Sequence, residues 1–347
     1  MKKVICMSLS LALAMGALTG CQTPSASKSS GEKLRIVTTI FPEYDWVREI
    51  LGDQADRVEL TMLLDDGVDL HSFQPTADDM VAISNCDLFL YTGGESDGWV
   101  EDALTNSANP HRATMDLMDI LGDAVKAEEM VEGMQETEHH HSHEEDHEED
   151  HDHEEDHDHE EDHDHEEHDH DDEHIWLSLR NAAVLCGAIA DTLGAIDHEH
   201  QTTYAENAAA YIQKLIDLDG RYQAAVDASS TRTLLFADRF PFRYLVDDYG
   251  LTYYAAFSGC SAETEASFET VAFLAGKADE LSLPCVLTIE GTTHGIAETV
   301  VGNTGGKNQE ILTLDSMQSV TAADVAAGAS YLSIMEQNLE TLKAALR

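Results

Sequence analysis

Apolar positions along the first third of the chain follow two periods in turn, and this pattern predicts alternating strands and helices. Short β-branched or apolar runs are followed by segments in which apolar residues recur every three or four positions. Strands that alternate with helices at this spacing favour a parallel sheet in an α/β layer fold. The expected strands are 33–40, 58–64 and 88–92, and the expected helices are 44–51, one capped by Thr76 and one from about residue 99.

The second half of the chain repeats this pattern. Between the halves lie an expected helix, 176–193, and a longer one, 201–228, which contains no proline and would be about 40 Å long. The sequence therefore predicts an α/β fold of two similar lobes, with central, mostly parallel sheets, joined by one long bridging helix. The expected strands of the second half are 233–237, 251–257, 284–290 and 311–314, and its expected helices are 240–249, 268–281, one near residue 298, and 325–346.

The first 33 residues are expected to direct the chain out of the cytoplasm. Two lysines precede an apolar run, 4–18, that is too short to span a membrane comfortably. The run leads into a Leu-Thr-Gly-Cys motif that ends at Cys21 and resembles the lipobox of bacterial lipoproteins, in which the cysteine is lipidated. We expect a signal peptide, 1–20, a flexible tether, 21–33, and an extracytoplasmic protein anchored to the bacterial cell membrane through lipid on Cys21. An ordinary secretory signal is the alternative.

The predicted elements also suggest domain boundaries. We expect an N-terminal α/β lobe at 34–200, the bridging helix at 201–228 and a C-terminal α/β lobe at 229–347. The N-terminal lobe would include a disordered loop, 135–173, rich in His, Asp and Glu.

A low-complexity run, 138–173, makes up most of that loop and consists of 22 acidic residues, 13 histidines and one serine. It has no apolar side chain to bury, so we expect disorder. Imidazoles suit Zn, Cu, Ni and Fe, and a disordered chelator should bind such ions weakly, and more weakly as pH falls through ~6.5. A purely solubilising tract is the alternative. The histidines expected to bind metal weakly are His139, His140, His141, His143, His147, His151, His153, His157, His159, His163, His165, His168 and His170.

The charge of the chain excludes some classes of partner. The net charge is −49, and it is still −27 without the 22 acids of the run. Such acidity argues against nucleic acid and against binding to anionic lipid through a basic surface. It fits a protein that attracts cations.

The cysteines suggest no thiolate metal cluster, because no CxxC pair occurs. Cys86 and Cys186 sit in apolar contexts and are expected to be buried. Cys260 and Cys285 could form a disulfide in an exported protein, and the sequence leaves this open.

Candidate metal ligands follow strand ends in both halves. Ligands of open α/β sheets bind outside the carboxyl ends of the strands, and between lobes where there are two. His71 follows the strand 58–64, His174 follows the run, Asp238 follows 233–237, and Glu290 ends 284–290. Two nitrogens and two carboxylates could hold a divalent ion, although a strand-end acid is often only a helix cap.

Three stretches resemble the zinc/manganese ABC-transporter solute-binding proteins, the ZnuA/TroA/AdcA-like family. DDGVDLHSFQPTADDM (65–80) resembles the first metal-ligand region, and DEHIWLSLRNAAVL (172–185) resembles the second, His-x-Trp-Leu before a helix. IEGTTHGIAETVVGNTGGKNQEILTLDSM (289–317) resembles the last region, where an acid ends a strand. The resemblance covers about 33–347, and a His-rich acidic loop before the second region is typical of the zinc-specific members.

The resemblance implies a ligand set. His71, His174 and Glu290 carry over as metal ligands, and His294 is a possible additional one. The third region departs from the family, because zinc members commonly have His-Asp-Ala-(Phe/Tyr) there and this chain has Ala-Asp-Arg-Phe, so Asp238 is the nearest available ligand. The bound ion is expected to be Zn(II), which the His-rich run favours, with Mn(II) or Fe(II) as the alternative.

The resemblance also implies a function. The expected protein is a monomer that captures the ion and delivers it to an ABC permease and its ATPase. A surface metal buffer or adhesin not coupled to transport is the alternative. An enzyme is not expected, because a metallohydrolase would need an open metal position together with a general base.

Overall fold

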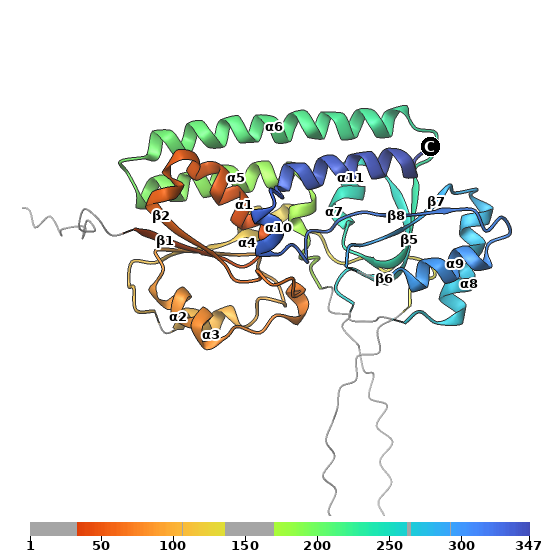
Figure 1. Ribbon diagram of the computed structural model, residues 1–347, viewed down its shortest axis with the longest axis horizontal. Coiled ribbons are helices and arrows are strands. Elements are labelled where there is room, and N and C mark those ends of the chain that lie inside the picture. Colours follow the sequence, from red (N-terminus) through yellow and green to blue (C-terminus); the bar gives the residue numbers. More distant parts are fainter. Residues whose placement is uncertain (1–32, 106, 136–169, 262–264, 292) are drawn as a thin grey trace, which may run out of the picture. The chain divides into compact units, whose positions relative to one another are not determined.

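Two four-stranded sheets, all of whose strand pairs are parallel, lie at the centre of the fold (Figure 1). The computed structural model describes residues 33–105, 107–135, 170–261, 265–291 and 293–347. The signal peptide, the lipidation site Cys21, the tether up to residue 32 and the run histidines from His139 to His168 lie outside the described residues. Leu34–Arg347 forms one compact unit.

The two sheets have the same strand order, which confirms the predicted α/β fold with two similar lobes. The first sheet is ordered β2-β1-β3-β4 and the second β6-β5-β7-β8. The boundaries assigned to the lobes remain a prediction. The strands are β1 (Leu34–Thr38), β2 (Val58–Met62), β3 (Leu88–Tyr91), β4 (Ala113–Asp116), β5 (Thr233–Phe240), β6 (Thr252–Ser258), β7 (Cys285–Thr288) and β8 (Glu310–Thr313).

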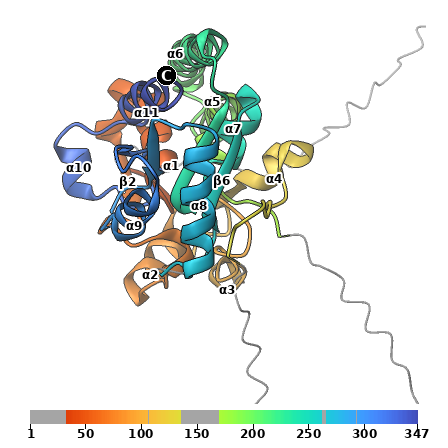
Figure 2. The same cartoon turned by 90° about the vertical axis from the view of Figure 1, so that its right-hand side faces the viewer.

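Helices flank the sheets, and several begin at a side chain that caps the first turn (Figure 2). The hydroxyl oxygens of Thr76, Ser178 and Ser267 each accept a hydrogen bond from a backbone N–H in the following turn. The helices are α1 (Phe41–Leu51), α2 (Ala77–Asn85), α3 (Val100–Thr105), α4 (Leu117–Leu121), α5 (Leu179–Ile196), α6 (Gln201–Ala228), α7 (Arg243–Tyr249), α8 (Phe268–Glu280), α9 (Gly295–Asn303), α10 (Ala322–Ala326) and α11 (Tyr331–Ala345).

Helix α6 has the bounds that its apolar period predicts, and it joins elements from both halves of the chain (Figure 1). It packs against α1 and α5, which precede it in the chain, and against α7 and α11, which follow it. Asn207 donates to the Ile50 carbonyl, and the hydroxyl of Tyr222 donates to the Met335 carbonyl at 2.6 Å. Its buried residues are Tyr204, Ala208, Tyr211, Leu215, Leu218, Tyr222 and Val226.

The hydrophobic core is continuous between the two sheets. Ile36 of β1, Leu88 of β3 and Phe236 of β5 belong to one cluster of buried side chains, to which α5 and α6 also contribute. Among the described residues, α5 alone is long and apolar enough to cross a membrane, and its buried face is part of this core. A second, smaller cluster lies under α8 and α9.

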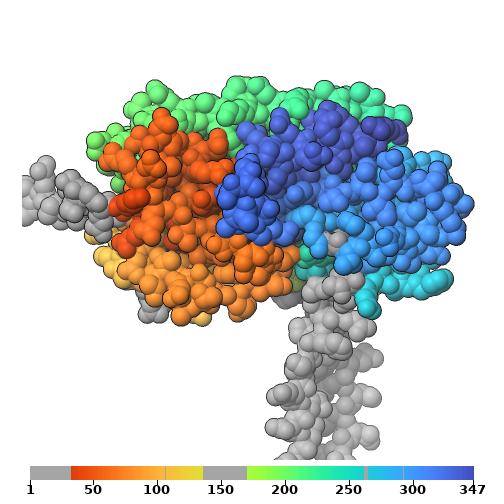
Figure 3. All heavy atoms as spheres, in the orientation of Figure 1, coloured from red at the N-terminus to blue at the C-terminus, as the bar shows by residue number. Residues whose placement is uncertain are grey.

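The α10 segment of the second half lies against the first half (Figure 3). The N–H of Ala322 donates to the Asp65 carbonyl at 2.7 Å. The helix expected over 325–346 is in fact two helices, because Gly328 has φ +103° between them, a conformation that interrupts a helix. β4 and α4 were not predicted, since the stretch from residue 115 is only moderately apolar.

Strand β5 is longer than its sequence suggests. It runs to Phe240, so the helix expected from that residue begins only at Arg243. The ring of Phe240 stacks on Tyr253 of β6 with centroids 3.6 Å apart. This aromatic packing between strands favours extended backbone over another helical turn.

Both ends of the His-rich loop are ordered, so the expectation of disorder over all of 135–173 is wrong at these residues. Gln135 donates its N–H to the Ala256 carbonyl, and Asp171 forms a β-bridge with Ala127. Asp172 and Glu173 are buried. Carboxylates can be buried where they accept hydrogen bonds, and the partners of these two are part of the site described below.

Glu43 of α1 is a fully buried carboxyl group in the first half. One of its oxygens accepts hydrogen bonds from the N–H and hydroxyl of Thr39 and from the N–H of Ile40, and the other accepts one from Thr92. Burial, together with the nearby charge of Asp97, raises the pKa of Glu43 to about 8 despite these hydrogen bonds.

The raised pKa of Glu43 predicts a pH-dependent loss of stability. An unfolded chain releases this proton near pH ~4.3, whereas the folded protein keeps it up to about 8, so its contribution to stability is lost as pH rises between these values. Glu43→Gln should therefore flatten the decline of the urea unfolding midpoint between pH 5 and pH 8 in metal-free protein. Glu49→Gln, on the same helix but partly exposed, is the control. Identical pH profiles for wild type and Glu43→Gln would contradict the assignment.

Candidate metal centre

His71 lies in a short 3-10 turn, Leu70–Ser72, beyond the end of β2. Asp69 positions this turn, because one of its carboxylate oxygens accepts the N–H of His71 at 3.0 Å. The other oxygen of Asp69 accepts a hydrogen bond from Arg239 of β5 at 2.7 Å. The loop that carries His71 is therefore tied to the second half of the chain by an ion pair that is largely removed from solvent.

His174 lies just after the run and is fully buried. Its Nδ1 is 2.9 Å from a carboxylate oxygen of Asp172, which also accepts the N–H of His174. The hydroxyl of Tyr244, on α7, donates to the Asp172 carbonyl, and the indole N–H of Trp176 donates to the Ser316 carbonyl. The second half of the chain thus fixes the segment on both sides of His174.

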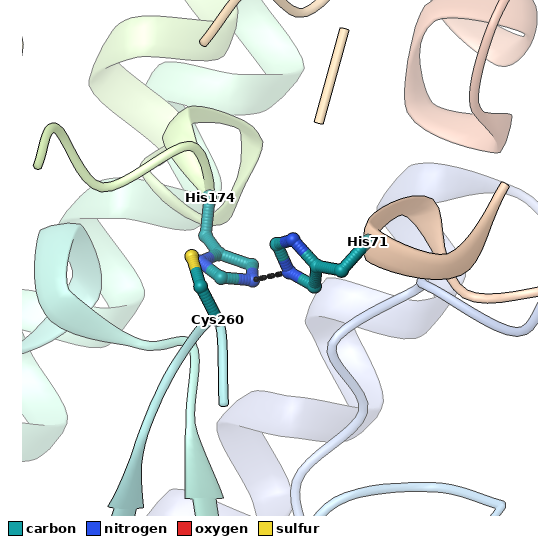
Figure 4. A group of neighbouring side chains, drawn as sticks. All are labelled: His71, His174 and Cys260. Carbon is teal, nitrogen blue, oxygen red and sulfur yellow. Dashed lines mark hydrogen bonds between the residues drawn. The ribbon is translucent and has the colours of Figure 1, made fainter. Parts of the chain in front are cut away.

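The two imidazole rings converge, with their Nε2 atoms 3.2 Å apart (Figure 4). Nδ1 of His71 faces the hydroxyl of Ser96 at 2.7 Å and a carboxylate oxygen of Glu173 at 3.4 Å. Acceptors behind both Nδ1 atoms favour the tautomer whose proton is on Nδ1, which leaves both Nε2 lone pairs directed at the same region.

This geometry suits a cation between the rings. Two lone pairs facing each other at 3.2 Å repel unless a proton or a metal ion lies between them. Two imidazole nitrogens bound to a tetrahedral zinc ion at about 2.0–2.1 Å would lie about 3.3 Å apart. The observed separation therefore matches what zinc requires.

The pKa shifts around the rings have electrostatic causes. Burial alone would lower the pKa of His174, but the carboxylates of Asp172, Glu173 and Asp69 together outweigh it and raise that pKa. Burial alone would raise the pKa of Glu173, but hydrogen bonds from His71 and Ser96 lower it. The acidic side chains behind the imidazoles would compensate for the charge of a buried cation.

The Cys260 thiol, in the loop after β6, is the third potential ligand group (Figure 4). One ligand atom from each of His71, His174 and Cys260 lies within 4.8 Å of the other two. Burial, reinforced by the charge of Glu128, raises the pKa of the thiol. Cys260 and Cys285 are both free, so no disulfide joins them, and Cys86 and Cys186 are buried as predicted.

The structure does not bring the other predicted ligands into this group. Asp238 accepts hydrogen bonds from the N–H groups of Arg239 and Ile289. Glu290 accepts three hydrogen bonds, from the N–H and hydroxyl of Ser316 and the N–H of Gln318. His294 occupies the N-cap position of α9 with φ +56°, and its side chain makes no capping hydrogen bond. Their roles as ligands stay predictions.

Among the run histidines, only His170 is in the described part of the chain. Its Nδ1 is 2.7 Å from a carboxylate oxygen of Glu95, at the surface, and it is not part of the group around His71. Its role as a weak metal ligand also remains a prediction.

Sequence reasoning missed the residues that support the imidazoles, and it missed Cys260. The Asp-Glu-His order at 172–174 was a usable signal, because acids next to a ligand histidine often hold its second nitrogen. No local motif marks Cys260, since its neighbours in the site come from distant parts of the chain.

Comparison with known proteins decides the family. Residues 36–345 match the family described as "ZnuA: Zinc-uptake complex component A periplasmic". The chain belongs to the ZnuA family. The zinc-binding lipoprotein AdcA of Streptococcus pneumoniae is 31% identical over 323 residues, which is 92% of this chain but 57% of that protein. This chain therefore spans little more than half the length of that ZnuA-family relative.

One further protein and one solved domain match this chain over nearly their whole length. The high-affinity zinc uptake system protein ZnuA of Bacillus subtilis is 28% identical over 334 residues, covering 96% of this chain and 94% of that protein. The crystal structure of the Zn(II)-bound ZnuA-like domain of S. pneumoniae AdcA has 26% identity and a TM-score of 0.66, covering 90% of this chain and 99% of that one.

The hydrogen bond from His174 to Asp172 predicts an effect on metal affinity. Asp172→Asn removes the negative charge behind the ring and should lower the Zn(II) affinity of the site by about 10- to 100-fold. Asp171→Asn, at the exposed neighbouring position, is the matched control. Titration against a competing chelator at substoichiometric zinc measures the tight site. Equal affinity in the two variants would show that Asp172 does not support the ligand.

Proposed function

We propose that this protein is the extracytoplasmic zinc-binding component of an ABC importer, which captures Zn(II) at His71 and His174 and delivers it to a membrane permease. The observation that supports this most directly is the pair of Nε2 atoms 3.2 Å apart, each on a ring whose other nitrogen faces acceptors. A pair of rings oriented in this way suits metal binding better than core packing.

Family membership and the names of relatives support zinc as the ion. Relatives are named as zinc-binding or zinc-uptake proteins, and one solved relative is bound to Zn(II). Because the chain spans only 57% of AdcA, we infer the activity from the part of that protein that it matches. Mn(II) prefers oxygen ligands, and two imidazoles at this spacing, one buried and one partly buried, favour zinc over it.

Capture and release follow from the positions of the two ligands. His174 is held by Asp172 and buried, whereas His71 lies in a turn whose anchor is Asp69. A small shift of that turn would lengthen the distance between the two Nε2 atoms and weaken the site without disturbing His174. The Asp69–Arg239 ion pair would couple such a shift to the second half, so docking on the permease could drive release.

The regions outside the described residues would serve delivery. We infer that the run histidines from His139 to His168 collect ions weakly near the site. Lipid on Cys21 would hold the protein at the cell membrane near a permease and its ATPase. The protein would act as a monomer and carry out no chemistry on its substrate, since ion transfer breaks and forms only coordination bonds.

Loss of either imidazole should abolish tight binding. His71→Ala and His174→Ala should each lower Zn(II) affinity by more than about 100-fold, which exceeds the cost of losing a supporting residue. His198→Ala removes an exposed imidazole and is the control. Chelator competition gives the affinities, and zinc-limited growth of cells that depend on this protein gives transport.

The outcomes separate the candidate functions. Tight binding that survives both substitutions would overturn the site. A surface buffer or adhesin would bind zinc at the lobes or the run but would not support growth in limiting zinc. Mn(II) that competes at similar affinity would indicate a manganese protein of the same fold.

Two deletions should distinguish the run from the site. Replacement of 138–169 by a short Gly-Ser linker should reduce the number of zinc ions bound but leave the tightest affinity unchanged. Extension of the same replacement to 138–173 removes Asp172 and Glu173 and should abolish tight binding. Total zinc is counted by equilibrium dialysis and the tight site by chelator competition. If the shorter deletion also loses the tight site, the run itself supplies the principal ligands.

A further inference from the structure

The segment that follows β6 is packed directly onto the ring of His174. A Cβ atom on Gly259 would lie 3.0 Å from Cε1 of that ring and 2.9 Å from the Phe240 carbonyl oxygen, so glycine allows this approach. The next residue, Cys260, donates its N–H to a carboxylate oxygen of Glu128, which comes from a different part of the chain. Two separate contacts therefore hold the thiol beside the imidazole.

We propose that Cys260 is the third ligand of the zinc site, supplying a thiolate sulfur where relatives in this family commonly offer a third histidine. This inference rests on the proposed function. The sulfur of Cys260 lies within 4.8 Å of the ligand atoms of His71 and His174, and it sits next to the ring of His174 (Figure 4). A tetrahedral zinc ion needs nitrogen and sulfur about 3.6 Å apart, a distance that a small movement of this side chain provides.

The competing carboxylates are already engaged. To reach the ion, Asp238 would give up hydrogen bonds from the backbone of Arg239 and Ile289, and Glu290 would give up three from Ser316 and Gln318. Leaving buried donors unpaired is costly. By contrast, the hydrogen bond from Cys260 to Glu128 is donated by its backbone N–H, so metal binding through the sulfur leaves this bond intact.

A site of two nitrogens and one sulfur has a definite selectivity. Thiolate is a soft ligand that favours zinc, and Mn(II) prefers carboxylate, carbonyl and water. Binding replaces the thiol proton by the metal, and the proton leaves to solvent, so no oxidant or reductant is needed. Three protein ligands leave a fourth position through which the ion can be exchanged.

Co(II) is the probe, because thiolate bound to it gives a near-ultraviolet charge-transfer band that imidazole and carboxylate do not. The chain from residue 22 on, which contains the whole compact unit, is titrated with Co(II) and then with Zn(II) in a thiol-free reductant. The run histidines add nothing to this band, because Co(II) bound to imidazole does not give it. Wild type should show the band, and Zn(II) should abolish it. Cys260→Ser should lack it and bind Zn(II) at least about 10-fold more weakly.

Cys285→Ser is the control, since Cys285 is also free but is not in the site. It should keep both the band and the affinity. If Cys260→Ser does not fold, as judged by its urea unfolding midpoint, X-ray absorption of wild type at substoichiometric zinc decides: a sulfur shell at about 2.3 Å supports the proposal and an all-nitrogen-and-oxygen shell overturns it.

Two outcomes distinguish a failure of this inference from a failure of the proposed function. If no band or sulfur shell appears while His71→Ala still loses tight zinc, Cys260 is not a ligand and the proposed function stands. If His71→Ala keeps tight zinc, the site itself is wrong and this inference fails with it.

Discussion

The hydrogen bond between His174 and Asp172 is the interaction on which the site depends. It holds Nδ1 of a fully buried ring, so the lone pair of Nε2 can point only toward His71. A buried imidazole without such a partner would lose the hydrogen bonds of water and gain none. The rest of the local structure keeps this pair in position: Tyr244 binds the Asp172 carbonyl from α7, and Trp176 reaches Ser316.

The frame around this pair joins both halves of the chain. Tyr331 of α11 donates its hydroxyl to the Trp176 carbonyl and its N–H to Asp45 of α1. The core is continuous across the two sheets, and α6 contacts helices of both halves. Because so many buried contacts cross between the halves, a small movement of the His71 turn costs less than a wide opening would. This is the physical basis for proposing release through that turn.

The acidic run and the folded site meet at residues 170–173, and the two parts use the same residue types differently. In the folded part, Asp172 and Glu173 are buried, and each faces one imidazole. These carboxylates support the imidazoles because of where the fold places them, and not because the run is rich in acids. The strong negative charge of the whole chain should concentrate cations around such a site, while the geometry selects among them.

The sequence by itself determined the fold class, the long helix over 201–228 and the two histidines that face each other. The fold class and the helix follow from local periodicity, whereas the two histidines were singled out by their places after a strand and after the run and by the resemblance to the family. It also argued against a thiolate cluster because no CxxC pair occurs, but that spacing says nothing about a single thiol.

Only the tertiary structure decided what surrounds the imidazoles. Cys260 reaches His174 because β6 ends beside it and Gly259 leaves room for the ring. Arg239 pairs with Asp69 across 170 residues of sequence. The end of the run is ordered because the fold supplies partners that bury its carboxylates. Contacts between residues so far apart are set by packing, which no local pattern of the sequence encodes.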